Sequence, residues 1–276
     1  MTTNAIIGTI FGDIVGSVFE VNNTKNYNFK MCGWDTHYTD DTVLTIATAD
    51  WLAHGGSVES YYDTYGHKYP CGYGKGFRTW LNAIGSAKNK CHSEGNGSAM
   101  RVSPIGCYAQ TIEDVLGLAE TSALCTHNTQ DGIEGAKFVA AAIFWIRKGC
   151  SKEQVKENLA AITSYNIDLK YDEIKDDYGW KYGATCKGTV PYAFIAFYES
   201  NSFEDAIRRA VSLGGDSDTI AAICGGMAAA YYGIPQKYVD FVCEKLPKEF
   251  LDVINQFDGK ALSYLKKDKE NINEEF

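Results

Sequence analysis

The sequence lacks the patterns that mark secreted, membrane or zinc-ribbon proteins. Its nine cysteines are odd in number and form no CxxC pair, which argues against a disulfide framework and a zinc ribbon. The N-terminus has no basic start followed by an apolar core, so we expect no signal peptide. The longest apolar run, around Ile220–Tyr232, is too short and too rich in glycine and alanine to span a bilayer. These absences predict a cytoplasmic protein in a reducing compartment.

A surplus of basic charge is also absent. The 276 residues include 26 Lys and Arg against 35 Asp and Glu, which gives a formal net charge of −9. This balance excludes bulk binding to nucleic acid or to an anionic membrane, because both need a basic surface. It leaves room for a small anionic ligand held at a local site.

Strand alternation, repeats of fixed period and linkers are missing too. Apolar residues recur instead at helical spacing over most of the chain, and only the segment 164–184 is expected to be irregular. The predicted helices span residues 4–20, 41–54, 57–69, 76–87, 112–125, 129–149, 152–163, 185–199, 202–213, 217–232 and 246–267, with one more opened by Pro235. We predict one all-α domain over residues 1–276, an orthogonal bundle of roughly a dozen helices, with a frayed tail at Lys266–Phe276.

Two acidic clusters stand at predicted helix starts, at Thr39–Thr42 and Gly215–Thr219. Each has two carboxylates close together, at least one hydroxyl and an apolar run after it. A single Asp or Thr in such a place would be an ordinary helix cap. Two neighbouring carboxylates repel each other unless a cation lies between them, and oxygen ligands of this kind suit Mg²⁺, Mn²⁺ or Ca²⁺. We predict that the fold brings both clusters together, at helix N-termini, around divalent cations.

The first predicted helix carries a second pattern. Gly8, Gly12 and Gly16 recur every fourth residue and leave one helix face bare, which predicts close packing against another helix. Glu20 ends this predicted helix and opens the polar segment 21–38, which we expect to be a mobile loop. A carboxylate in that place is either exposed to solvent or directed into a functional site.

Three features in the middle of the chain each have two interpretations. The glycines of Gly95–Gly97 can cradle an anion with their N–H groups, or simply form a turn. Arg101 can pair with a phosphate or with a carboxylate in the core. His127 can contact a ligand or cap the next helix.

Several of these motifs occur together and in order in one known family. The matching segments are Gly12-Asp13 with Gly16 and Glu20, then Thr39–Thr42, Tyr69–Gly74, Gly95–Arg101 with Pro104, Ser122 with His127, and Gly215–Thr219. With them the chain resembles the ADP-ribosylglycohydrolases, and most of all their compact microbial members, over residues 4 to about 240.

The resemblance implies an all-α fold with two Mg²⁺ or Mn²⁺ ions. Carried over by position, the metal ligands are Thr39, Asp40, Asp41, Asp216, Asp218 and Thr219. Glu20, Asp40 and Asp41 become the candidates for proton transfer, and the substrate contacts become Gly95, Asn96, Gly97, Ser98, Met100, His127 and Tyr73. The resemblance therefore favours the functional interpretation of Glu20 and His127.

The expected reaction is hydrolysis at the anomeric carbon of ADP-ribose, which releases ADP-ribose from a modified protein or a small conjugate through an oxocarbenium-like transition state. A monomer is expected. Two other functions stay open: a two-metal phosphohydrolase of nucleotide diphosphates, and an inactive protein that binds ADP-ribose. The acceptor group does not follow from the motifs, because members of the family vary in the segments 21–38 and 164–184.

Overall fold

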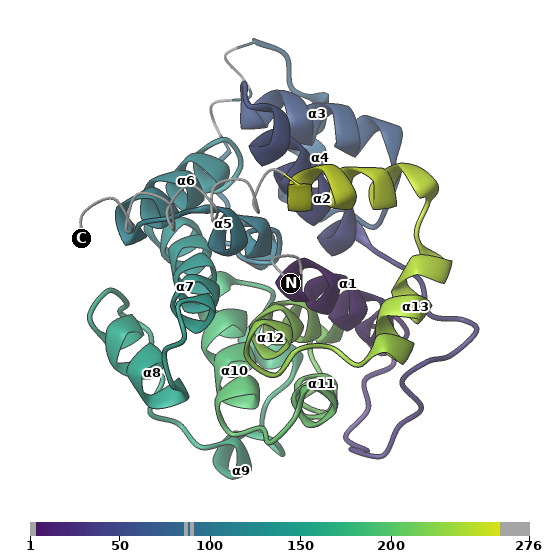
Figure 1. The fold of residues 1–276 in the computed structure, drawn as a ribbon, viewed down its shortest axis with the longest axis vertical. Helices are drawn as coiled ribbons and strands as arrows, with labels where there is room; N and C mark the ends of the chain where they lie inside the picture. Colours follow the sequence, from purple (N-terminus) through teal and green to yellow (C-terminus); the bar gives the residue numbers. More distant parts are fainter. Residues whose placement is uncertain (1–3, 86–87, 89–90, 260–276) are drawn as a thin grey trace, which may run out of the picture.

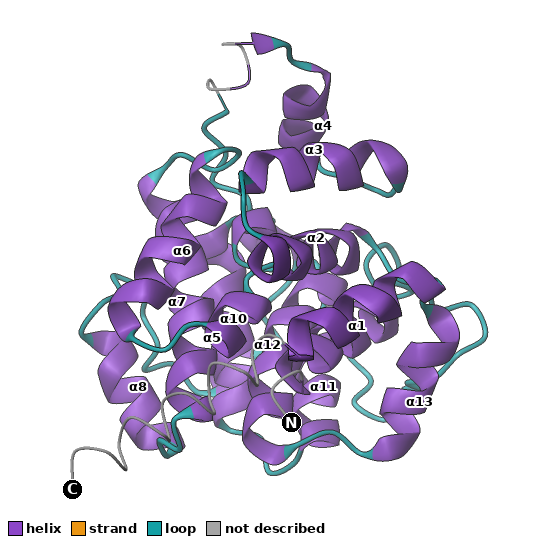
Figure 2. Cartoon of the chain, turned by 45° about the horizontal axis from the view of Figure 1, so that its top comes forward, coloured by secondary structure: helices purple, strands orange, loops and turns teal. Residues whose placement is uncertain are grey.

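A computed structural model describes residues 4–85, 88 and 91–259. Within these residues the protein is built from helices and loops without a strand, as predicted (Figures 1 and 2). The helices are α1 (Asn4–Gly16), α2 (Asp40–His54), α3 (Val58–Lys68), α4 (Lys75–Asn82), α5 (Ser103–Tyr108), α6 (Ile112–Leu124), α7 (Gln130–Arg147), α8 (Lys152–Ala160), α9 (Tyr171–Ile174), α10 (Cys186–Tyr198), α11 (Phe203–Ser212), α12 (Ser217–Tyr232) and α13 (Gln236–Lys245), followed by helical residues 248–259. Two short 3₁₀ turns are η2 (Asn96–Ser98) and η3 (Trp180–Tyr182).

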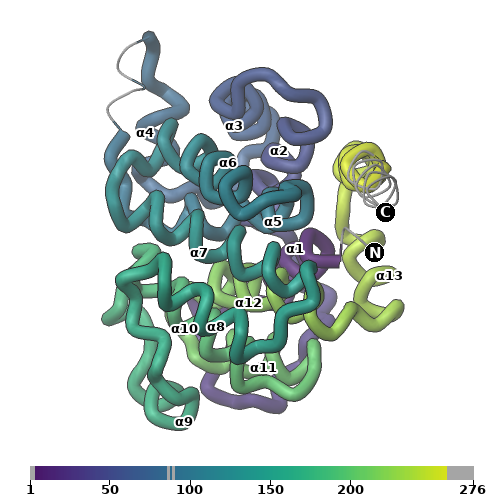
Figure 3. The backbone as a smooth tube through the Cα atoms, turned by 60° about the vertical axis from the view of Figure 1, so that its left-hand side comes forward, coloured from purple at the N-terminus to yellow at the C-terminus, as the bar shows by residue number. Residues whose placement is uncertain are grey.

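Helices α1 and α12 cross the centre of the molecule side by side, and the other helices surround them (Figures 1 and 3). The glycine pattern of α1 makes this pairing possible. A Cβ atom on Gly12 would lie 2.0 Å from the carbonyl oxygen of Ala221, and one on Gly16 would lie 2.4 Å from the Cα atom of Asp218. The close helix packing predicted from the glycines is therefore confirmed, and it places the end of α1 against the start of α12.

The outer helices close a continuous apolar core around this pair. Helix α11 shows the principle: Phe203, Ile207 and Val211 recur at helical spacing and are buried, because one face of an amphipathic helix must be covered by another element. Side-chain oxygens of Thr or Ser cap the starts of α6, α7, α8, α10 and α11. Each cap accepts a backbone N–H that would otherwise have no partner in the helix.

The first predicted helix is shorter than expected. It ends at Gly16 and not at Glu20, because the chain turns there: the Phe19 N–H donates to the Gly16 carbonyl, and the Ser17 hydroxyl donates to the Ile14 carbonyl. The predicted helix 76–87 likewise ends early, at Asn82. The predicted helix 246–267 begins after Pro247, and its end, like the predicted tail at Lys266–Phe276, lies outside the described residues.

The segment 21–38 is irregular, as expected, but it is anchored to the helices below it. Arg208 donates to the carbonyls of Tyr27 and Phe29, and Lys245 donates to the carbonyl of Thr36. The ring of Phe29 is buried against the core. These contacts fix the path of the chain from the end of α1 to the start of α2.

The structure bears on two expectations drawn from absences. All nine cysteines are free thiols in the structure. Among the described residues, no helix has the length and apolar character needed to cross a membrane.

Candidate active site

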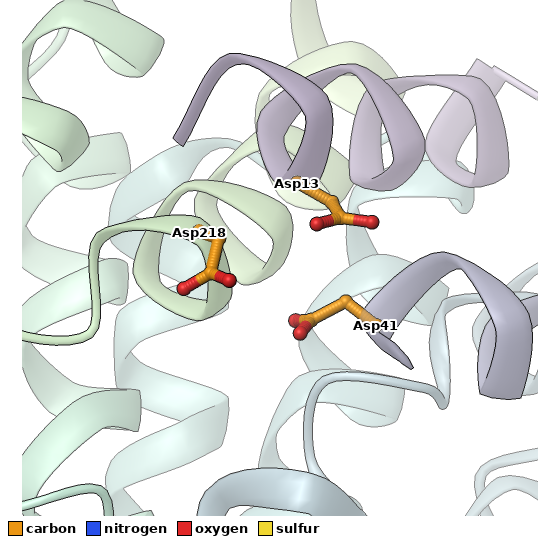
Figure 4. A group of neighbouring side chains, drawn as sticks. All are labelled: Asp13, Asp41 and Asp218. Carbon is orange, nitrogen blue, oxygen red and sulfur yellow. The ribbon is translucent and has the colours of Figure 1, made fainter. Parts of the chain in front are cut away.

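Three aspartates from three distant parts of the chain point toward one another (Figure 4). Asp13 comes from the last turn of α1, Asp41 from the first turn of α2 and Asp218 from the first turn of α12. Carboxylate oxygens of these residues lie within 4.8 Å of one another. The two acidic clusters, at the starts of α2 and α12, therefore meet beside the end of α1.

A second group of carboxylates adjoins the first. Oxygens of Glu20, Asp216 and Asp218 also lie within 4.8 Å of one another, so Asp218 belongs to both groups. Asp40 lines the same cavity. These carboxylates make no ion pair with a lysine or arginine among the described residues. The two groups could therefore hold a metal ion through their oxygens.

Asp13 differs from the others because its oxygens are already occupied. It accepts the backbone N–H groups of Thr39 and Thr42, at 2.9 and 3.1 Å, and the hydroxyl groups of both threonines. Asp13 therefore caps the start of α2 from another helix. In the sequence, Asp13 stands out only as part of the motif with Gly12, Gly16 and Glu20. Its isolation in an otherwise apolar, fully buried helix was the signal that it had a partner elsewhere.

Asp41 has one carboxylate oxygen that is only weakly hydrogen-bonded and one that has no partner. Its Oδ2 lies 3.3 Å from the hydroxyls of both Thr39 and Thr219, and the Thr39 hydroxyl is closer, at 2.7 Å, to Asp13. Its Oδ1 is buried and has no hydrogen-bond partner. A buried carboxylate oxygen without a donor costs on the order of 1–3 kcal/mol or more. A divalent cation bound by hard oxygen ligands would remove that cost, so the donor set fits Mg²⁺ or Mn²⁺.

The pKa values of the cluster lead to the same conclusion. Burial raises the pKa of Asp41 and of Asp218 well above the ordinary value, and neighbouring carboxylates raise it further. The pKa of Asp40 rises to about 7, first through burial and then through the charge of Asp13. Burial also raises the pKa of Glu20, with a further contribution from Asp216. Without cations, this site retains protons that free carboxylic acids would lose.

The side chain of Asn23 ties Glu20 to the second acidic cluster. Its Nδ2 donates to the carbonyls of Glu20 and Gly215, at 3.1 and 2.9 Å, and its Oδ1 accepts the N–H of Gly215 at 2.7 Å. Gly215 has a φ of +70°, which favours glycine, and directly precedes Asp216. Asn23 thus holds the turn after α1 beside the turn before α12. The sequence offered no local signal for this role in a polar loop.

A cavity of about 300 Å³ opens above the carboxylates. Glu20, Asp40, Asp41, Asp216, Asp218 and Thr219 form one side, and Gly95, Asn96, Gly97, Met100 and His127 line it as well. Asn96 joins the two parts, because its Nδ2 donates to Asp216 Oδ2 at 2.7 Å. The cavity therefore combines an acidic side with a glycine turn.

The remaining expected site residues lie elsewhere. Ser98 is fully buried and donates its hydroxyl to the carbonyl of Gly132. Tyr73 is buried beside the cavity and donates to the carbonyl of Tyr69, and its neighbours Gly72 and Gly74 line the cavity in its place. Thr39 is not part of the cavity lining, but its hydroxyl donates to Asp13 and lies 3.3 Å from Asp41 Oδ2. The structure does not bring the side chains of Ser98 and Tyr73 into the cavity.

Trp180 lines the cavity and was not expected there. It lies in η3, within the segment expected to be irregular, between Gly179 and Gly183, and its side chain is 48% exposed. An exposed tryptophan beside a cavity offers a planar apolar surface to a ligand. The aromatic composition of the segment 164–184 was the only signal for it.

Comparison with known proteins identifies the family. A family model described as ADP-ribosylglycohydrolase matches residues 2–267. The chain belongs to the ADP-ribosylglycohydrolase family. The resemblance drawn from the motifs is thereby confirmed.

Relatives in this family carry names that describe enzymes. The ADP-ribosylhydrolase ARH3 of Mus musculus is 24% identical over an alignment that covers 84% of this chain and 83% of the relative. The ADP-ribosylarginine hydrolase Tri1 of Pseudomonas putida is 25% identical, covering 95% of this chain and 81% of the relative. A solved structure titled "ADP-ribosylglycohydrolase-related protein complex" superposes with a TM-score of 0.70 at 24% identity, over 94% of this chain and 97% of that one, and it shows that the fold is shared. The family and these names support an ADP-ribosyl hydrolase.

Proposed function

We propose that this ADP-ribosylglycohydrolase is a metal-dependent hydrolase that cleaves the glycosidic bond at the anomeric carbon of ADP-ribose. One observation carries the proposal: buried carboxylates without a cationic partner share a cavity with the glycine turn of Gly95–Gly97 and with His127. A phosphate-bearing sugar presents both kinds of group, hydroxyls for a cation side and a diphosphate for an anion side. The substrate would then span the cavity from Asp218 to His127.

Two divalent cations, Mg²⁺ or Mn²⁺, would suit the acidic side of the cavity, where the two carboxylate groups share Asp218. We propose Asp40, Asp41, Asp216, Asp218 and the hydroxyls of Thr39 and Thr219 as their ligands. Asp13 stays outside this set, because four donors already occupy its oxygens. When bound, the ions would orient the ribose hydroxyls and polarise a water molecule.

The protein's own groups then supply the proton transfer and the orientation. Glu20 is held by Asn23 at the edge of the cluster and is partly exposed to the cavity, so it is placed to exchange a proton with water or the leaving group. Asp40 and Asp41 are the other candidates. The N–H groups of Gly95 and Asn96 already donate to the Ser93 hydroxyl and the Ala184 carbonyl. The Gly97 N–H would therefore be the donor of this turn that binds the diphosphate and helps to fix the sugar in one orientation.

The decisive experiment is a panel of ADP-ribosylated substrates incubated with EDTA, Mg²⁺ or Mn²⁺. ADP-ribosylarginine peptides are the first choice, because the relative Tri1 is named for that linkage. Release of intact ADP-ribose only with the metal supports the proposal. Products AMP and ribose phosphate would identify a phosphohydrolase instead, and binding without turnover would identify an inactive protein. The variant Asp218→Asn should release no ADP-ribose. The matched control is Asp172→Asn, at a side chain that is 83% exposed, and it should keep the activity of the wild type.

A further inference from the structure

Arg101 is a buried arginine in the lining of the cavity, and it has no carboxylate partner among the described residues. The side chain of Arg101 is fully buried and makes no ion pair among the described residues, so the core carboxylate considered from the sequence is not found there. The guanidinium carbon lies 4.1 Å from the centre of the Tyr62 ring. Its Nη2 donates to the Ser122 carbonyl at 2.6 Å and to the Thr126 hydroxyl at 2.9 Å.

The donor in these hydrogen bonds determines which atom donates in the hydrogen bond between Thr126 and His127. An arginine only donates, so the Thr126 oxygen must accept from Arg101. The same oxygen lies 2.7 Å from His127 Nδ1. The other acceptor beside the Thr126 hydroxyl is the sulfur of Cys125, which accepts only weakly. The hydroxyl proton therefore goes to Nδ1, which carries the lone pair.

His127 is held in the neutral form. Burial, and after it the charge of Arg101, lowers the pKa of this histidine well below its usual value. A neutral imidazole carries one ring proton. Since Nδ1 accepts, that proton sits on Nε2.

The Nε2 edge of the ring faces the glycine turn. A Cβ atom on Gly97 would lie 3.2 Å from Nε2, and one on Gly95 would lie 3.5 Å away. No residue of the described chain accepts a hydrogen bond from Nε2, and both glycines line the cavity with His127. The N–H is therefore available to a ligand seated on the turn.

We propose that Arg101 and Thr126 are positioning residues, which act through the tautomer of His127 so that Nε2–H donates to a phosphate oxygen of the ligand. The identity of that ligand rests on the proposed function. The opposite tautomer would turn a lone pair toward the anion and lose a hydrogen bond to a charged group.

The tautomer can be read directly in the free protein. Long-range ¹H–¹⁵N spectra at pH 7 distinguish a protonated Nε2 from a protonated Nδ1, and His127→Gln assigns the signal among the five histidines. We expect an unprotonated Nδ1 and a protonated Nε2 in the wild type. A protonated Nδ1, or a doubly protonated ring, overturns the proposal without reference to any substrate.

The consequence for binding is measured by calorimetry with ADP-ribose and Mg²⁺. Thr126→Val removes the hydroxyl that links Arg101 to His127, here called the relay, and keeps the shape of the side chain. Thr126→Ser keeps the hydroxyl and is the matched control. We expect Thr126→Val to raise the Kd about tenfold or more and to populate the other tautomer, with Thr126→Ser close to the wild type. Equal Kd values for both variants would overturn the role in binding.

The two proposals fail in different ways. If the wild type binds ADP-ribose and shows the expected tautomer but releases no ADP-ribose from any substrate, the hydrolase proposal fails and the relay stands. If ADP-ribose is released but Nδ1 carries the proton, the relay fails and the hydrolase stands. If the wild type does not bind ADP-ribose, the phosphate role of His127 is wrong.

Discussion

Divalent cations should stabilise this protein, and more so at higher pH. Among the clustered carboxylates, Asp40 has its pKa raised from 3.8 to about 7 in the folded state. Between these values the folded protein binds more protons than the unfolded chain. The stability of the metal-free protein therefore falls as pH rises through this window, by about 4 kcal/mol for a shift of about three pKa units.

Bound cations reverse this loss by replacing the protons. At a free Mg²⁺ concentration of about one hundred times Kd, the added stability is about 2.7 kcal/mol. For a chain of this size, that corresponds to a rise in Tm of about 5–10 °C. At pH 5 protons compete with the metal, so the rise should be smaller.

The assay is thermal unfolding in EDTA and in Mg²⁺, at pH 5 and pH 8. Asp41→Asn should unfold at a higher temperature than the wild type in EDTA, because it removes a buried carboxylate with an unpartnered oxygen, and should lose the response to Mg²⁺. Asp172→Asn should behave as the wild type. His127, whose pKa is lowered by burial, adds an opposite pH trend below about pH 6.5 in both proteins, so the wild type is compared with Asp41→Asn. The reasoning is refuted if, relative to Asp41→Asn, the metal-free wild type gains stability from pH 5 to pH 8, or if saturating Mg²⁺ leaves the wild-type Tm unchanged at pH 8.

Three further predictions follow from single positions. Glu20→Gln and Asp218→Asn should each lower kcat by about 10²-fold or more while circular dichroism shows an intact fold, and near-normal turnover by both would contradict the proposed site. Gly12→Ala should lower the free energy of unfolding by several kcal/mol, as overpacking of a core does, because its Cβ atom would lie 2.0 Å from a carbonyl oxygen of α12. The control is Gly117→Ala on α6, where a Cβ atom meets nothing within 4 Å and the change should be neutral or mildly stabilising. Denaturant unfolding compares the two variants. Asn23→Ala should lower kcat with little change in ADP-ribose affinity, because it frees the turn that holds Glu20. An unchanged kcat would show that the hydrogen bonds from Asn23 to Glu20 and Gly215 are not needed for turnover.

Much of the site could be predicted because its parts are local patterns. Two carboxylates beside a hydroxyl at a helix start are visible in Thr39–Thr42 and Gly215–Thr219 without a structure, and so is the glycine face of α1. These patterns depend only on helical periodicity and on the chemistry of neighbouring side chains. The helical fold followed from the same periodicity.

Tertiary structure alone decided which side chains reach the cavity. Asp13 turns out to cap another helix, Ser98 and Tyr73 point into the core, and Trp180 reaches the cavity from an irregular segment. Side-chain direction depends on how closely α1 approaches α12 and on where the connecting turns fold back. Those contacts join residues far apart in the chain, so the sequence determined the chemistry available to this protein, and packing decided which groups meet to use it.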